Sequence, residues 1–250
     1  TIRPAETVVR VCAGVFRSAC KGGIYIPLLL LLFMIPKRNF GEKVKYPVVV
    51  ASAILLAVVT FAAVNSNIFK DVSSSTSGSE NELMWTESEG FTLRRMFTHP
   101  KEALCMLFNT FFLMGGTHYA EMFASGFGWL QIYTSGFLTA GFTVLMVLTL
   151  LNCEGREICF NKKQRIISLS AAAVSIFIIV ISMWIFWTPA GSAHIVGLQG
   201  RYFIPLLFCA VYPLKNSRCI IKKDIGGGII FTAVMFHALT FWEIYIRMAV

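Results

Sequence analysis

Long apolar runs, separated by short polar segments, dominate the pattern of this chain. Four of them approach the roughly 20 residues that a helix needs to cross a lipid bilayer: residues 46–65, 131–151, 166–187 and 225–246. Because a helix satisfies its own backbone hydrogen bonds, each run predicts a membrane-spanning helix. We therefore expect an all-α fold, a polytopic bundle of transmembrane helices that forms a single integral-membrane domain over residues 1–250.

Two shorter apolar runs, 22–36 and 203–214, lie near or below the minimum length for a complete crossing. Both contain proline, which removes a backbone donor and kinks or breaks a helix. Short or broken helices are tolerated at membrane depth where other helices bury them. We predict that these two runs are half-spans or re-entrant helices.

Basic residues cluster in three short loops between the apolar runs. Loops 37–45, 152–165 and 215–224 together hold 12 of the 22 Lys and Arg residues. Because cytoplasmic loops of membrane proteins are enriched in Lys and Arg, we place all three loops in the cytoplasm. The same pattern explains the net charge of +9 without a nucleic-acid partner.

A more polar stretch over residues 101–123 conflicts with this topology if it crosses the bilayer. The basic loops on either side of it need an even number of crossings between them, and two apolar runs already supply that number. The stretch also contains side chains that are costly in lipid, among them Asn109, His118 and Glu121. We expect an interfacial or re-entrant helix on the outer side of the membrane, preceded by an outer polar loop over residues 66–99.

Composition agrees with a membrane protein and excludes several other classes. Hydrophobic residues make up 56% of the chain and charged residues 14%, whereas about a quarter of a soluble domain is charged. The mean hydropathy is +0.68. The seven cysteines form no Cys-x-x-Cys pair, and no motif for a nucleotide, a cofactor or a metal is evident.

The main candidate site lies in residues 195–206, which read IVGLQGRYFIPL. Arg201 stands at the mouth of an apolar segment, where a guanidinium is costly unless it has a partner or reaches water. Because a guanidinium holds phosphate or carboxylate through two parallel hydrogen bonds, we expect Arg201 to bind an anionic group in an outer-facing cavity, with Gln199 and Tyr202 as neighbouring polar groups. The alternative is that Arg201 and Tyr202 only anchor the helix at the headgroup level.

Three further residues are candidates for substrate binding. His194 lies in the second predicted outer loop, and Arg94 and Arg95 precede the predicted outer helix. The arginine pair could bind lipid headgroups or an anionic substrate, and a solvated basic pair near the interface is the alternative. His118 and Glu121 share one helical face at a spacing of three residues, which could line a cavity but does not by itself predict catalysis.

Several landmarks together resemble one family. They are the segment KGGIYIP at 21–27, His99-Pro100 opening the outer helix, GFGW at 126–129, and Thr188-Pro189 leading to GLQGRYFIP at 197–205. This arrangement resembles bacterial membrane proteins grouped as domain of unknown function 2142, and it matches the C-terminal half of that family. Because the chain starts at Thr1 with residues typical of a helix already under way, we expect it to be part of a longer protein.

The DUF2142 family is in turn similar to integral-membrane glycosyltransferases of the GT-C class. The resemblance implies a role in cell-surface polysaccharide or glycolipid assembly at the bacterial plasma membrane, with membrane lipids and a polyprenyl-phosphate-linked sugar as partners. GT-C enzymes carry their catalytic acid in a first outer loop that has no counterpart here, so no catalytic residue is assigned and whether the chain is an enzyme stays open. A non-enzymatic transporter or flippase, or an assembly subunit of a surface-polymer complex, is the alternative.

Overall fold

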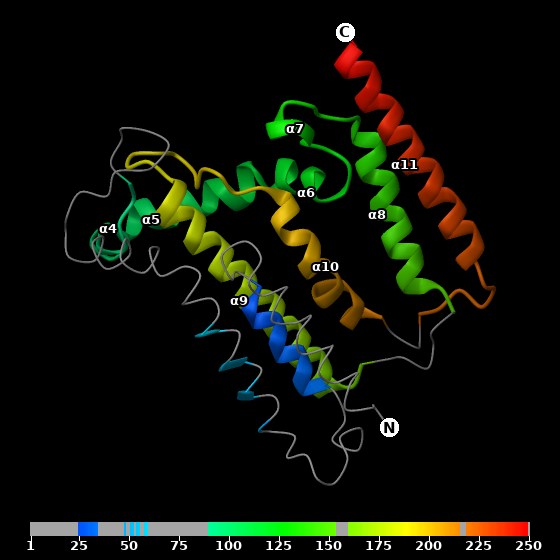
Figure 1. Ribbon diagram of the computed structural model, residues 1–250, viewed down its shortest axis with the longest axis horizontal. Coiled ribbons are helices and arrows are strands. Elements are labelled where there is room, and N and C mark those ends of the chain that lie inside the picture. Colours follow the sequence, from blue (N-terminus) through cyan, green and yellow to red (C-terminus); the bar gives the residue numbers. More distant parts are fainter. Residues whose placement is uncertain are drawn as a thin grey trace. The chain divides into compact units, whose positions relative to one another are not determined.

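The computed structural model describes residues 25–34, 90–153, 160–215 and 219–249, together with a few positions between 48 and 59 (Figure 1). These residues form helices joined by turns, and the β-bridges among them are isolated ones. The all-α prediction is confirmed for the described residues. In chain order the helical elements are η2 Ile26–Met34, α4 Leu93–Thr98, α5 Pro100–Phe108, η4 Asn109–Leu113, α6 Gly115–Phe123, α7 Phe127–Leu130, α8 Gly136–Leu151, α9 Lys162–Trp187, η5 Gly200–Phe203, α10 Ile204–Val211, η6 Tyr212–Leu214 and α11 Gly226–Ala249.

Among the described residues, two helices, α9 with 26 residues and α11 with 24, are long and apolar enough to cross a membrane. They confirm that the runs predicted at 166–187 and 225–246 are helical and make both helices candidate membrane spans, while the crossing itself stays a prediction. The loop predicted over 152–165 is too long, because α9 already begins at Lys162. Lysine and arginine carry long apolar stems, so they continue a helix while their charged ends reach water.

The predicted span at 131–151 is also too long. Helix α8 begins only at Gly136, and its 16 residues extend about 24 Å. The residue before it, Ser135, donates its backbone N–H and its hydroxyl to the carboxylate of Glu243 at 2.8 and 3.0 Å. This contact fixes Ser135 in an extended conformation at the start of α8, so residues 131–135 do not join the helix.

Short helices lie within both short apolar runs, and their placement as half-spans or re-entrant helices stays a prediction. Residues 203–214 form α10 and η6, with Pro205 in the first turn of α10. Residues 26–34 form the 3₁₀ helix η2. The span predicted at 46–65, the basic loop 37–45 and most of the outer loop 66–99 lie outside the described residues.

The stretch 101–123 is divided into three pieces. Pro100 is the first residue of α5, as the His99-Pro100 pair predicts. The five-residue π-helix η4 follows, and the backbone N–H of Met114 closes it by donating to the carbonyl of Asn109 at 3.1 Å. Helix α6 then starts at Gly115. A π-turn interrupts the regular helical ladder, so one continuous helix is not formed, and the interfacial or re-entrant placement stays a prediction.

The chain divides into two compact units. The first unit contains residues 1–107 and 163–197, and the second contains residues 108–162 and 198–250. In the second unit α8 and α11 lie side by side and antiparallel, because the start of α8 meets the end of α11 through Ser135 and Glu243 (Figure 1). Close packing brings Phe236 against Gly141, where a Cβ atom would lie 2.3 Å from the ring.

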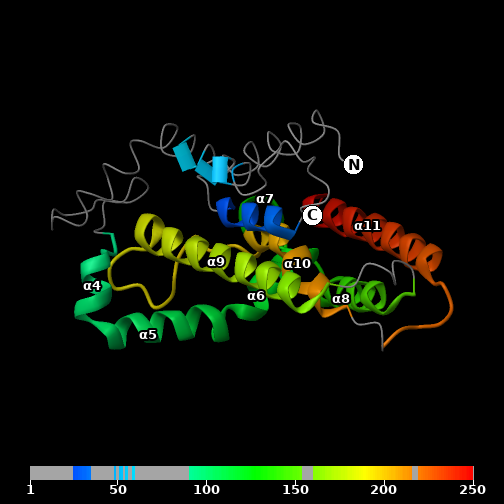
Figure 2. The same cartoon turned by 90° about the horizontal axis from the view of Figure 1, so that it is seen from below.

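In the first unit, Thr188 organises the turn after α9. Its side chain is fully buried, donates to the carbonyl of Met183 at 3.0 Å, and accepts from the backbone N–H of Val196 at 3.1 Å. Its carbonyl accepts from the backbone N–H of Phe91, whose ring packs on Trp184 at 5.4 Å. Thr188 therefore ties the end of α9 to the segment that leads into α4, and Figure 2 shows α4 turning steeply into α5.

Replacement of Thr188 by valine is expected to destabilise the protein by about 1–2 kcal/mol, because a buried backbone N–H of Val196 loses its acceptor while the side-chain volume is kept. Thermal unfolding of the purified protein in detergent measures this loss. Thr98→Val is the matched control, since Thr98 is exposed and its hydroxyl bonds only to neighbours within four residues, the carbonyls of Arg94 and Arg95 and the ring of His99. Equal melting temperatures for Thr188→Val and wild type would contradict the role assigned to Thr188.

Candidate functional site

The turn that carries Arg201 is seated directly on helix α6. The backbone N–H of Gly200 donates to Oε2 of Glu121 at 2.6 Å, and the Glu121 side chain is only 4% exposed. A Cβ atom on Gly200 would lie 1.8 Å from the carbonyl oxygen of His118 and 2.8 Å from Cβ of Glu121. No side chain fits in this space. Glycine is required here by the close approach of two backbones.

His118 lies beside the same carboxylate. Its Nδ1 is 3.5 Å from Oε2 of Glu121, which confirms that the two residues share one face of α6. The His118 side chain is 12% exposed, and neither ring nitrogen has a hydrogen-bond partner within the described residues. Gly126, in the left-handed conformation with φ of +71°, closes the other side of the Glu121 side chain.

Glu121 is a buried carboxylate that stays ionised at neutral pH. Burial raises the pKa of Glu121, but the contact with His118, the hydrogen bond from Gly200 and the nearby charge of Arg201 together lower it below the usual glutamate value. A charged group that is buried and paired in this way holds its neighbours in fixed positions. The site therefore contains a rigid, negatively charged side chain, that of Glu121, beneath the turn that carries Arg201.

Arg201 itself is exposed, on the 3₁₀ turn η5. Its Nε donates to Oε1 of Gln199 at 2.5 Å, and the backbone N–H of Tyr202 donates to the carbonyl of Gln199 at 3.1 Å. The three predicted residues therefore lie together on one turn. A guanidinium has five N–H donors, and the bond to Gln199 uses the one on Nε, so the two terminal nitrogens face outward without a hydrogen-bond partner in the described part of the chain.

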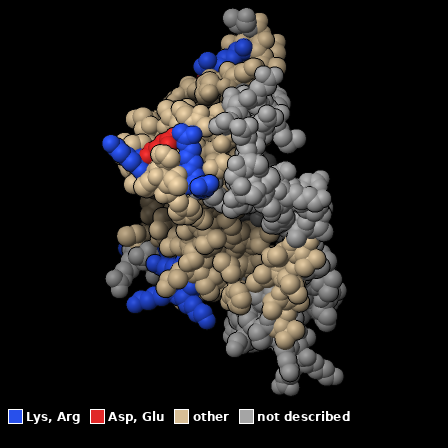
Figure 3. All heavy atoms as spheres, turned by 90° about the vertical axis from the view of Figure 1, so that its left-hand side faces the viewer, with Lys and Arg blue, Asp and Glu red and all other residues tan. Residues whose placement is uncertain are grey.

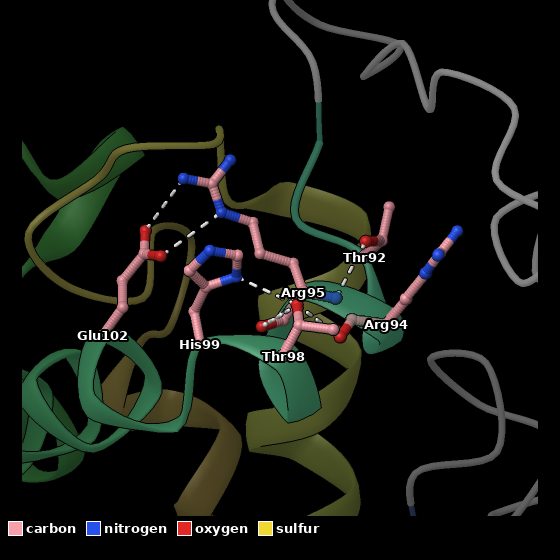
Figure 4. Close-up of polar contacts among 6 residues, drawn as sticks. All are labelled: Thr92, Arg94, Arg95, Thr98, His99 and Glu102. Atoms are coloured by element: carbon pink, nitrogen blue, oxygen red, sulfur yellow. Dashed lines mark hydrogen bonds and ion pairs between the residues drawn. The ribbon is translucent and has the colours of Figure 1, made fainter.

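The arginine pair of the first unit has two different environments (Figure 4). Arg95 donates to both carboxylate oxygens of Glu102, at 3.3 and 3.2 Å, and its guanidinium lies 5.6 Å from the centre of the Phe91 ring. Thr92 caps the helix by accepting from the backbone N–H of Arg95 at 3.3 Å. Arg94 points away from this group and is exposed. An anion would have to displace Glu102 from Arg95, whereas Arg94 is accessible.

Figure 3 shows the face that carries α4 and α5, where basic side chains lie on both sides of an acidic one. The charged residues of this stretch are Arg94, Arg95, Lys101 and Glu102. A surface pair such as Arg95 with Glu102, 39% and 30% exposed, contributes little stability. The stretch therefore matches the solvated basic segment more closely than a preformed anion site.

The six predicted residues fall into two groups. Gln199, Arg201 and Tyr202 belong to the second unit, and Arg94, Arg95 and the half-buried His194 belong to the first. Within the described ranges, no group of three His, Cys, Asp or Glu residues lies close enough to hold a metal ion.

Glu121 and Gly200 are site residues that the sequence did not identify. Glu121 is visible in the sequence only as half of a polar pair, and Gly200 only as a residue of a tight turn. Gly197 does have a positive φ of +79°, whereas Gly200 does not. The contact between Glu121 and Gly200 joins positions 79 residues apart, which no local pattern indicates.

The comparisons with known proteins give one match. The model of the family described as "Predicted membrane protein (DUF2142)" matches residues 1–210. No curated protein and no solved structure matches the chain.

Proposed function

We propose that this chain, which belongs to the DUF2142 family of predicted membrane proteins, binds the phosphate of a lipid-linked sugar at Arg201. The binding would serve a membrane glycosyltransferase reaction in the assembly of cell-surface polysaccharide or glycolipid at the bacterial plasma membrane. Family membership and the two long apolar helices support a membrane protein. The sugar donor and the reaction are our proposal.

The proposal rests on one observation: the exposed guanidinium of Arg201 is fixed in place by a turn that the buried Glu121 holds. Glu121 holds the backbone at Gly200, Gln199 holds Nε of Arg201, and the outer nitrogens stay accessible. A guanidinium in this state can bind phosphate through two parallel hydrogen bonds without first being ordered. An arginine that only anchors a helix to lipid headgroups needs no such support.

The chemistry follows from where charge develops. In glycosyl transfer the acceptor hydroxyl attacks the anomeric carbon, the bond from that carbon to the phosphate oxygen breaks, and the phosphate leaves with additional negative charge. A fixed cation at the phosphate stabilises this charge in the transition state. Arg201 would supply that stabilisation, and Gln199 and Tyr202 would border the phosphate or the sugar. The base that takes the acceptor proton is not assigned to a residue of this chain.

A specific observation favours a non-enzymatic alternative. Each of the four carboxylates in the described residues is already bound internally: Glu102 to Arg95, Glu121 to Gly200, Asp224 to Gly226, and Glu243 to Ser135. None is free to act as a catalytic acid or base. A transporter, a flippase for the lipid carrier, or an assembly subunit of a surface-polymer complex needs only the binding step and would use the same arginine.

Substitution of Arg201 tests the binding role. We expect Arg201→Ala to weaken binding of a polyprenyl phosphate by at least roughly tenfold, and Arg201→Lys to weaken it too, because lysine keeps the charge but loses the two-pronged geometry. Binding is measured on the purified protein in lipid nanodiscs, and surface-glycan output on cells that express the full-length protein at matched levels.

Arg94→Ala and Arg94→Lys are the matched controls, because Arg94 is also exposed but lies outside the Arg201 turn. Normal binding and normal glycan output from both Arg201 variants would rule out the role of Arg201. A different result would favour the carrier or assembly alternative: the Arg201 variants bind polyprenyl phosphate weakly, yet sugar transfer still proceeds in the absence of this protein.

A further inference from the structure

An apolar groove of about 440 Å³ runs between α8 and α11. It is lined by one stripe of each helix, at spacings of three and four residues that place the side chains on a single face. The lining residues are Phe137, Ala140, Gly141, Val144, Leu145 and Leu148 on α8, and Ile225, Gly228, Ile229, Thr232 and Phe236 at and along α11.

The groove exists because the two helices are held at both ends while small residues face each other between them. At one end Glu243 accepts from Ser135. At the other, the backbone N–H of Ile221 donates to the carbonyl of Leu151 at 2.8 Å. In between, Gly228 has open space around the position of a Cβ atom. The helices pack closely where Phe236 meets Gly141, and the space between them opens toward Gly228.

The Ile225 end of the groove is basic. Lys222 and Lys223 directly precede it, and both are exposed. The carboxylate of Asp224 is directed at the backbone instead, since it accepts from the N–H of Gly226 at 2.9 Å and from the side-chain amide of Asn152 at 3.2 Å. Among the described residues at this end, two lysines stand against one carboxylate that is already bonded, so their balance is positive. The start of α11 adds the positive end of a helix dipole.

From this arrangement we propose that the groove holds one acyl chain of an anionic phospholipid, whose phosphate lies at Lys222 and Lys223. The groove from Ile225 to Phe236 follows eleven residues of helix, a length of about 16 Å, and its walls are almost entirely apolar. An extended acyl chain fits a long narrow apolar groove, and charge complementarity at its mouth selects an anionic headgroup. A second protein helix would leave the lysine pair without a counter-charge.

This lipid site is separate from the Arg201 turn and does not rest on the proposed function. It predicts a preference that ordinary boundary lipid would not show. We expect the wild-type full chain to retain phosphatidylglycerol over phosphatidylcholine with identical acyl chains by roughly 25-fold, because each of the two lysines near an anionic headgroup contributes about a factor of five. Native mass spectrometry of the purified protein, released from detergent after incubation with each lipid, measures the retained adducts.

Two pairs of variants separate the groove from the charge. Gly228→Phe fills the groove, whereas Gly227→Phe places the same ring one position away, where the residue is exposed and does not line the groove. Lys222→Gln with Lys223→Gln removes the charge, and Lys162→Gln with Lys163→Gln removes an equally exposed pair elsewhere. We expect Gly228→Phe to lose the phosphatidylglycerol adduct and the Lys222/Lys223 variant to lose the preference, with both control variants like wild type.

Equal retention of the two lipids by the wild type would overturn the proposal. So would equal adducts in Gly228→Phe and Gly227→Phe. A wild-type dimer that forms without lipid and that Gly228→Phe dissociates would assign the groove to a second copy of the chain, and would overturn it too.

Discussion

Replacement of Gly200 by alanine is expected to separate the Arg201 turn from α6 and to lower the melting temperature by roughly 6–12 °C. The added Cβ atom would lie 1.8 Å from the carbonyl oxygen of His118. Because that oxygen belongs to the backbone, no side-chain rotation can relieve the contact. Overpacking in a tight interior costs about 3 kcal/mol when the backbone has to shift, and each kcal/mol corresponds to roughly 2–4 °C in a protein of this size.

The same substitution is expected to weaken anion binding at Arg201, because the hydrogen bond from Gly200 to Glu121 cannot form once the turn moves away. Thermal unfolding in detergent and binding of polyprenyl phosphate give the two readouts. Gly116→Ala is the matched control. Gly116 lies on α6, the helix against which the Gly200 turn packs, and a Cβ atom there meets nothing within 4 Å. Alanine is also a better helix former than glycine. A Gly200→Ala protein as stable as Gly116→Ala would show that the two segments do not pack as described.

Much of the fold could be predicted because local patterns determine it. The apolar runs locate α9 and α11 to within a few residues, since length and hydrophobicity alone define a membrane-spanning helix. The His99-Pro100 pair marks the start of α5. The glycines of the 126–129 segment mark the turn at α7, where Gly126 and Gly128 have φ of +71° and +50°.

Two predicted helices have boundaries that differ from those in the structure. The predicted span starts at residue 131, but Ser135 is extended and bonds to the carboxylate of Glu243, and α8 starts only at Gly136. The π-helix η4 divides a stretch whose residues predict one continuous helix. At the start of α8 the contact joins residues 108 positions apart, and a single sequence contains no direct signal of such packing.

In the candidate site, too, the features set by local chemistry could be predicted and those set by contacts between distant residues could not. Arg201 and its neighbours were identified from local chemistry, because an arginine beside an apolar helix is costly and so has a reason to be there. Arg95 has the same local chemistry, yet Glu102 one helix further along the chain neutralises it. What distinguishes the two arginines is the partner of each, and that becomes visible only in three dimensions.

Glu121 is the second residue at which a large effect is expected. Glu121→Ala should destabilise the protein by about 2–3 kcal/mol, because the buried N–H of Gly200 loses a charged acceptor and a cavity forms beside His118. Glu121→Gln keeps an acceptor oxygen of the same shape, so it should cost only about 1 kcal/mol. Glu102→Gln is the matched control, since it removes an exposed carboxylate from a surface pair worth little stability.

The pH dependence identifies the ionised form of Glu121 as the one that stabilises the fold. The pKa of Glu121 is lower in the folded protein than in the unfolded chain, because the contacts with His118, Gly200 and Arg201 outweigh the effect of burial. The folded state therefore binds fewer protons, so the stabilisation is complete above the unfolded value of about 4.3 and is lost as the pH falls through the lower folded value. Melting temperatures measured from neutral pH down to about pH 3 should fall more steeply for the wild type than for Glu121→Gln, which has no proton to bind at this position. Parallel curves for the two proteins would mean that the charge of Glu121 does not hold the Arg201 turn, and the rigid base under that arginine would then have to come from the packing of Gly200 alone.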